Sequence, residues 1–169
     1  MDYPKPVNFL PADKVLSARF SPIPPPFLRR PPRTGRKRQG ILYEERVHQW
    51  LDDEFAGSFV PGPWIVFDDS KRRVRWCQPD GLLFDVRRGR VTVIEAKHSH
   101  CAQAWFQLFQ LYIPVVCLLF PPPSWSVVGI EIVRWFDPHT ATPVAAIKRA
   151  NVLDALEGQF CVHIFKPRS

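Results

Sequence analysis

The alternation of apolar and polar residues predicts most of the secondary structure. Apolar residues at helical spacing predict helices over Gly40–Phe55 and Cys101–Tyr112. Short runs rich in β-branched and aromatic residues predict strands at Trp64–Phe67, Arg73–Cys77, Asp80–Val86 and Val91–Lys97. Further along, we expect strands at Val115–Phe120, Val127–Phe136 and Phe160–Phe165 and a helix over Thr142–Glu157.

The order of these elements predicts a single α/β domain in which helices flank a central mixed sheet. Residues 39–169 would form this domain. Residues 1–38 would form an extended arm outside the sheet, because Met1–Pro32 holds nine of the nineteen prolines and proline interrupts helices and ladders. With 46% apolar residues in 169, the chain can bury a core of its own.

Two of the predicted strands form a hairpin that gathers charge at one end. Asp80–Val86 and Val91–Lys97 are joined by a turn that contains glycine. A two-residue turn would set Asp80 opposite Lys97. Glu95 would then lie on the same face as Asp80, diagonal to it at about 7–8 Å between backbones. Such crowding of carboxylates is costly unless a cation or a phosphate joins them.

This end of the hairpin resembles the signature of the PD-(D/E)XK, or restriction-endonuclease-like, nuclease superfamily. Asp80, which follows a proline, would be its first acidic residue, and Glu95-Ala96-Lys97 would be its Glu-x-Lys. The resemblance implies that Asp80, Glu95 and the Ala96 carbonyl bind Mg²⁺ and that Lys97 orients or activates the attacking water. It also implies a restriction-endonuclease-like αβββαβ core, here roughly residues 40–120, followed by a C-terminal β-α-β extension.

Glu44 lies among apolar neighbours on the core side of the first predicted helix. It is either a carboxylate at the edge of the core or a functional residue. Together with Gly40, Tyr43 and Val47, it is similar to a G-x-x-Y-E-x-x-V pattern found in phage and recombination nucleases of this superfamily. The resemblance implies that Glu44 completes the metal site.

Three glutamines, Gln103, Gln107 and Gln110, form a stripe on the second predicted helix. Exposure to solvent explains such a stripe, but neutral amides also suit a face turned towards a metal-bound water or a phosphate. Related nucleases carry a Gln, often with a Tyr, on the helix after their Glu-x-Lys. Gln107 with Tyr112 resembles that pair, although their spacing differs from the common Q-x-x-x-Y and leaves open which Gln is used.

The net charge of +7 lies entirely within residues 1–38, since the rest of the chain holds equal numbers of acidic and basic residues. A basic arm in front of a neutral domain predicts contact with phosphates, and a merely solvated tail is the alternative. The residues expected to contact DNA are Arg29, Arg30, Arg33, Arg36, Lys37 and Arg38 of the arm and Lys71, Arg72 and Arg73 of a second basic cluster.

Together these patterns predict a Mg²⁺-dependent nuclease that hydrolyses phosphodiester bonds of DNA, in repair, recombination, phage replication or defence. Hard oxygen ligands favour Mg²⁺, with Mn²⁺ as a substitute. One alternative is a non-catalytic nucleic-acid-binding protein whose acidic pair is structural. Another is an adaptor that presents its proline-rich arm to a partner. The sequence leaves open the form of the DNA, RNA as substrate, endo- or exonuclease action, the number of metal ions and a homodimer.

Composition also bears on the compartment. The longest apolar stretch, near Ile113–Phe120, is too short to span a bilayer, and the proline-rich start lacks a secretory pattern, so no membrane association is expected. The cysteines never show C-x-x-C spacing, which argues against a zinc or iron–sulfur site and favours a reduced, cytoplasmic (intracellular) chain. His98 and His100 are expected at the surface or behind the site rather than as ligands.

Overall fold

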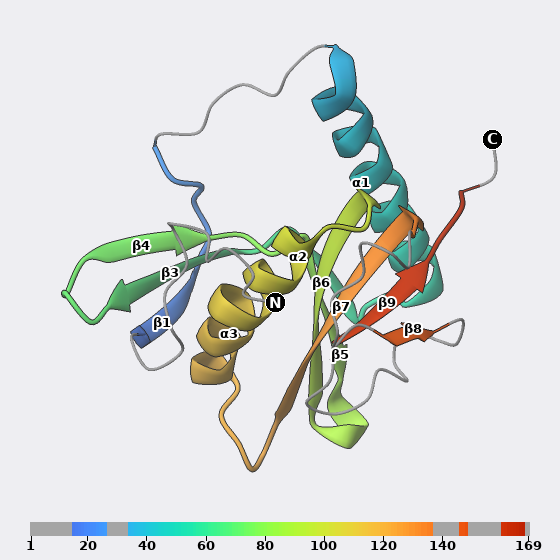
Figure 1. Ribbon diagram of the computed structural model, residues 1–169. Coiled ribbons are helices and arrows are strands. Elements are labelled where there is room, and N and C mark those ends of the chain that lie inside the picture. The colour runs from blue at the N-terminus through green and yellow to red at the C-terminus, as the bar shows by residue number, and fades with distance from the viewer. Residues whose placement is uncertain (1–14, 27–33, 137–145, 149–159, 168–169) are drawn as a thin grey trace.

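The computed structural model describes residues 15–26, 34–136, 146–148 and 160–167 and shows a mixed α/β architecture (Figure 1). Its helical elements are α1 (Gly35–Glu54), the 3₁₀ turn η2 (Val86–Arg88), α2 (Ala102–Gln107), the π-helical segment η3 (Leu108–Tyr112) and α3 (Ile113–Leu119). Its strands are β1 (Val15–Ser21), β2 (Phe59–Pro61), β3 (Trp64–Asp69), β4 (Val74–Cys77), β5 (Gly81–Asp85), β6 (Arg90–Ser99), β7 (Ser126–Trp135), β8 (Ala146–Lys148) and β9 (Phe160–Ile164).

The main sheet has six strands in the order β2-β5-β6-β7-β9-β8. β2, β5 and β6 are antiparallel neighbours, whereas β6, β7, β9 and β8 are paired in parallel. Helix α1 lies against one face, where Val47 and Leu51 pack with Ile132, and α2, η3 and α3 cover the other, where Leu108 and Val115 are buried. The predicted α/β class, with helices flanking a mixed sheet, is confirmed.

A second sheet of three strands, β1-β3-β4, extends away from the first (Figure 1). It arises because one long hairpin, β2–β3 against β4–β5, passes from the main sheet into the small one. The pairing register is the same on both sides of the break and places Pro63 opposite Pro79. Neither proline can donate to the ladder, so the hairpin bends here and the two halves join different sheets. Asp80 lies at this bend.

The expectation that residues 1–38 form an extended arm outside the sheet is wrong for residues 15–21 and 35–38, which belong to a strand and a helix. Val15–Ser21 forms β1, which pairs with β3 and packs on α3 through Phe20 and Phe120, whose ring centroids are 6.2 Å apart. Residues 15–21 contain no proline, which is why this part of the segment can form a ladder. Helix α1 also begins at Gly35, five residues earlier than expected. Phe59–Pro61, where no strand was expected from the sequence, forms β2.

The predicted register of the β5–β6 hairpin is also wrong, by two residues. Asp85 pairs with Arg90 and Gly81 with Ile94, so Asp80 faces Glu95 rather than Lys97. The turn is not a two-residue loop. It is the 3₁₀ segment η2 followed by Gly89 at φ 58°, and it is held by a hydrogen bond from Arg88 N to the Asp85 carboxylate. The predicted face is kept, because a shift of two residues preserves the alternation of side chains.

Val115–Phe120, expected as a buried strand, is helical. Helix α3 continues from α2 through η3, and Leu108, Tyr112, Val115 and Val116 are buried at helical spacing while Leu118 is exposed. The Ile113 N–H bonds to the Leu108 carbonyl, five residues back. We infer that this wider turn lets the helix accept Pro114, which has no N–H of its own to donate.

The continuous helix Ala102–Leu119 is long and apolar enough to cross a membrane by length and composition. A helix of this length was not expected from the sequence, because its second half was predicted to be a strand. Core helices of soluble proteins pass the same test, and here Leu108, Val115 and Val116 pack into the core. The helix is therefore no evidence for a bilayer span.

The C-terminal part agrees with expectation only in its strands. The predicted strands at Val127–Phe136 and Phe160–Phe165 are confirmed as β7 and β9. The helix predicted over Thr142–Glu157 is wrong at Ala146–Lys148, which forms β8 beside β9. The rest of that predicted helix lies outside the described residues.

Candidate active site

Asp80 is positioned by the bend of the long hairpin. Its carbonyl accepts a hydrogen bond from Gly62 N at 2.9 Å, and its carboxylate Oδ2 accepts one from Ala96 N at 2.6 Å. Ala96 lies beyond the last residue of β6 that β5 pairs with, so its N–H is free to bond the side chain. A backbone donor thus holds Asp80 across from Glu95, at the open end of the ladder.

Glu95 and Lys97 point to the same face of β6 and form an ion pair between Oε1 and Nζ. The Glu95 side chain is 2% exposed and that of Lys97 28% exposed, so the pair is buried on the Glu95 side and reaches solvent on the Lys97 side. Glu95 Oε2 is buried and has no hydrogen-bond partner. One carboxylate oxygen is therefore neutralised and the other is not.

Glu44 joins Asp80 and Glu95 from helix α1, which covers the face of the main sheet opposite to α2, η3 and α3. Burial and the charge of Asp80 raise the pKa of Glu44 to about 7. Burial and the same neighbour raise the pKa of Glu95 to about 8, and burial raises the pKa of Asp80 above its usual value. Burial alone would lower the pKa of Lys97, but the charges of Glu95 and Asp80 outweigh it, so the ammonium is retained. Three carboxyl groups, those of Glu44, Asp80 and Glu95, thus share the one ammonium of Lys97. They are called the acidic group below.

Gln107 and Tyr112 meet across the π-helical segment, with Gln107 Nε2 3.5 Å from the Tyr112 hydroxyl oxygen. Burial, and then the charges of Glu95 and Asp80, raise the pKa of Tyr112 well above its usual value. Gln107 Oε1 is buried without a hydrogen-bond partner. The structure therefore brings Gln107 and Tyr112 to the acidic group, whereas Gln103 is exposed.

Three residues that the sequence analysis did not select also lie near the acidic group. His48, one helical turn after Glu44, interacts electrostatically with Asp80 and has a buried Nε2 without a hydrogen-bond partner. Glu131 pairs with Glu95 in the parallel ladder, and its Oε2 lies 2.5 Å from Nδ1 of the buried His100. Two features of the sequence could have indicated these residues: the position of His48 one helical turn after Glu44, and the single carboxylate, Glu131, in the apolar run of β7.

The donor chemistry at this site fits a hard divalent cation. Glu44, Asp80 and Glu95 offer carboxylate oxygens, and the buried Glu95 Oε2 lacks any partner that would neutralise it. Among the described residues, however, no group of three His, Cys, Asp or Glu side chains is arranged to hold a metal ion. Lys97 on Glu95 Oε1 and Ala96 N on Asp80 Oδ2 engage two of the oxygens that such an ion would use.

Comparison of the chain with protein-family models, with curated protein sequences and with solved structures gives no match.

The predicted DNA-contacting residues fall into two groups in the described part of the chain. Arg36 and Lys37 are exposed in the first turn of α1, and Arg38 forms an ion pair with Glu45 at 3.6 Å. Lys71 and Arg72 are exposed in the β3–β4 turn. Arg29, Arg30 and Arg33 lie outside the described residues.

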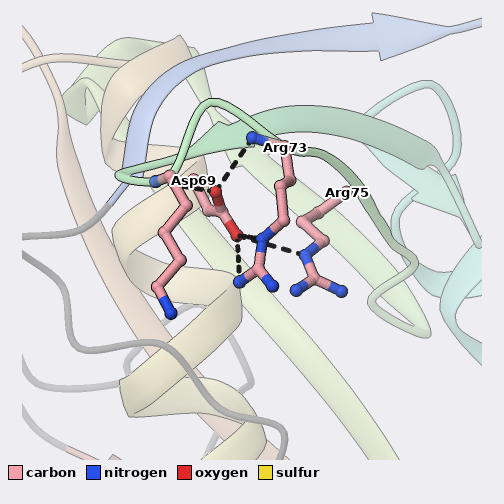
Figure 2. Close-up of polar contacts among 4 residues, drawn as sticks. Asp69, Arg73 and Arg75 are labelled. Atoms are coloured by element: carbon pink, nitrogen blue, oxygen red, sulfur yellow. Dashed lines mark hydrogen bonds and ion pairs between the residues drawn. The ribbon is translucent and has the colours of Figure 1, made fainter.

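Figure 2 shows that the β3–β4 turn is built around the buried carboxylate of Asp69. It accepts hydrogen bonds from the backbone N–H groups of Lys71 and Arg73 and from the guanidinium groups of Arg73 and Arg75. The Arg73 guanidinium holds the pKa of Asp69 well below its usual range. The side chains of Arg73 and Arg75 therefore stabilise the turn through Asp69 and also contribute to the surface. Lys71 and Arg72 supply the positive charge that the turn presents to solvent.

Proposed function

We propose that the chain is a Mg²⁺-dependent nuclease that hydrolyses phosphodiester bonds of DNA, within the restriction-endonuclease-like superfamily that its motif resembles. The observation that carries the proposal is the meeting of Glu44, Asp80 and Glu95 around the single ammonium of Lys97. Carboxyl groups with raised pKa values in one cluster need more positive charge than the chain supplies. A divalent cation would supply it.

Glu44, Asp80, Glu95 and the Ala96 carbonyl would hold the ion. When bound, Mg²⁺ supplies positive charge to the scissile phosphate and lowers the pKa of a coordinated water. The Ala96 N–H keeps Asp80 oriented for this role, since it already donates to Oδ2.

Lys97 would act on the substrate from the solvent side of the pair. Its ammonium stays charged and is partly exposed, so it can donate to a phosphate oxygen and offset the charge that develops there. Gln107 Oε1, buried and unpartnered, can accept a hydrogen bond from a water held beside the acidic group. Gln107 would therefore orient a water rather than carry charge.

Metal-dependent cleavage by two site variants tests the proposal. Circular and linear DNA are incubated with the natural chain, Asp80→Asn and Lys97→Met, in Mg²⁺ and in EDTA. We expect cleavage by the natural chain in Mg²⁺ alone and at least a hundredfold loss in both variants, because each removes several kcal/mol of barrier lowering. Asp85→Asn is a matched control, since Asp85 lies on the same hairpin and pairs with Arg88 outside the site. Equal cleavage by all four chains would refute the proposal.

A second candidate is a nucleic-acid-binding protein without catalysis, in which Lys97 simply neutralises Glu95. The closed ion pair between these two residues is the observation that favours it. Exposed Arg36, Lys37 and Lys71 would then supply the affinity for phosphates. Salt-sensitive binding of DNA in EDTA, together with no cleavage of any DNA or RNA form in Mg²⁺ or Mn²⁺, would favour this candidate.

A further inference from the structure

Two cavities lie side by side along α1 and at the ends of β6, β7 and β9, and Arg46 lines both of them. The first, of about 360 Å³, is bounded by α1 on one side and by His98, Arg134 and Trp135 on the other. The second, of about 600 Å³, is bounded by Trp50 of α1 and by residues 165–167, which follow β9. A shared wall makes them neighbouring parts of one concave surface.

This surface carries uncompensated positive charge. Arg46, Arg134 and Lys166 line it, and no carboxylate of the described ranges lies within ion-pair distance of any of the three. Asp53 is the acidic residue in the lining, and its Oδ1 already accepts a hydrogen bond from Gln49. An anionic ligand would therefore meet three cations and one carboxylate that is already engaged.

The same surface presents aromatic rings. Trp135 is 51% exposed although it is large and apolar. Two cations lie over its ring, with the Arg134 guanidinium carbon 5.7 Å and Lys166 Nζ 5.0 Å from the centroid. In the second cavity Trp50 stacks on Phe165, with centroids 4.4 Å apart and planes at 15°. Exposed rings beside unpaired cations are what bases and phosphates bind in single-stranded nucleic acid.

We propose that this surface, defined by Arg46, Trp50, His98, Arg134, Trp135 and Lys166, binds a short unpaired segment of nucleic acid. A base would stack on Trp135 in place of a cation that now lies over the ring, and the phosphates on either side would bind the guanidinium groups of Arg134 and Arg46. Each cavity has a volume in the range that suits a small ligand such as one nucleotide. Bases inside a duplex are stacked on each other and cannot reach the ring, so the occupant is single-stranded.

As a statement about substrate, the inference rests on the proposed nuclease function. The chain connects the two places directly: Tyr43 lines the first cavity and precedes Glu44, and His98 lines it and follows Lys97. Successive side chains of a strand point to opposite faces, so His98 and Lys97 lie on the two sides of β6. A single strand of nucleic acid bound on this surface would leave it beside the end of β6 where Glu95 and Lys97 lie.

Binding of fluorescein-labelled oligothymidine of twelve nucleotides tests the inference, with a twelve-base-pair duplex as the comparison probe. Fluorescence anisotropy in EDTA measures affinity without cleavage. We expect tighter binding of the single strand, a loss of about tenfold in Trp135→Ala and near-normal binding in Trp135→Phe, which keeps a stacking surface. Arg46→Gln and Arg134→Gln should each reduce the slope of log affinity against log salt by about 0.7. Arg87→Gln, at the other end of the β5–β6 hairpin, should leave that slope unchanged.

The outcomes separate this inference from the nuclease proposal, because binding is read in EDTA and cleavage in Mg²⁺. Preferential binding that depends on Trp135, without any cleavage, would support the surface and overturn the nuclease. Cleavage together with equal affinity for both probes would overturn the surface, as would unchanged affinity in Trp135→Ala. Trp135 is half exposed, and a thermal melt of each variant verifies that the fold is intact.

Discussion

Replacing Lys97 with methionine removes the ammonium from Glu95 while keeping most of the apolar stem. Glu95 has a pKa of about 8 in the folded chain, against about 4.3 when unfolded. A carboxyl group whose pKa is raised on folding binds more protons in the folded state, so the folded state loses stability as the pH rises from about 4.3 to about 8. Above pH 8 the loss stops in the natural chain, because Glu95 is ionised in both states.

Without Lys97, the loss should continue above pH 8, because the charge and hydrogen bond of Lys97 both lower the pKa of Glu95. At pH 7, one unit below this pKa, Glu95 is protonated in most molecules and the ion pair with Lys97 is present only in the remainder, so the electrostatic cost of the substitution is small. At pH 9, one unit above the pKa, the substitution should cost about 1.4 kcal/mol more than at pH 7. For a domain of this size, that corresponds to a further fall in Tm of about 3–6 °C.

Urea unfolding of the natural chain and Lys97→Met at pH 7 and pH 9, in EDTA, measures this difference. Lys71→Met is the matched control, because Lys71 is exposed in the β3–β4 turn and contacts Asp69 only through its backbone N–H. The same destabilisation at both pH values would show that Lys97 does not hold Glu95 in its ionised form. If the site takes Mg²⁺, adding it at pH 9 should stabilise Lys97→Met more than the natural chain, since the ion replaces the lost charge.

Three further substitutions have clear expected results. Glu44→Gln should reduce cleavage and the rise in Tm that Mg²⁺ causes, while stability in EDTA holds or increases above pH 7 because one of three crowded carboxylates is gone. An unchanged response to Mg²⁺ would show that Glu44 is only a carboxylate at the edge of the core. Asp69→Asn should lower Tm at pH 7, and the difference from the natural chain should shrink progressively below about pH 4 and be small only near about pH 2, since the stabilisation from its depressed pKa is lost as the pH falls through the folded pKa. Circular dichroism melts at about pH 7 and about pH 2 measure this. Gly81→Ala should destabilise by about 1–3 kcal/mol because its Cβ would overlap the Phe59 ring, and Phe59→Leu in the same chain should recover part of that in urea unfolding.

The sequence alone determined the elements whose apolar residues have a clear period. Val47 and Leu51 repeat at helical spacing, and both are buried in α1. The apolar runs of β5 and β6 predicted their hairpin, and the alternation of side chains placed Asp80, Glu95 and Lys97 on one face whatever the register. The sequence also showed where the basic residues cluster, including Lys71 in the segment that forms the β3–β4 turn.

Tertiary structure decided what local patterns leave open. A continuous apolar run such as Val115–Phe120 has no period, so burial of one side against the sheet made it helical rather than extended. The register of the β5–β6 hairpin depended on the geometry of η2, which the residues of the turn do not reveal by themselves. In the observed register Asp80 lies opposite Glu95 instead of Lys97. Pairing between distant segments made a strand of Val15–Ser21 and set Glu131 beside Glu95. Such contacts join residues far apart in the chain, and the local sequence does not encode which partner a strand will find.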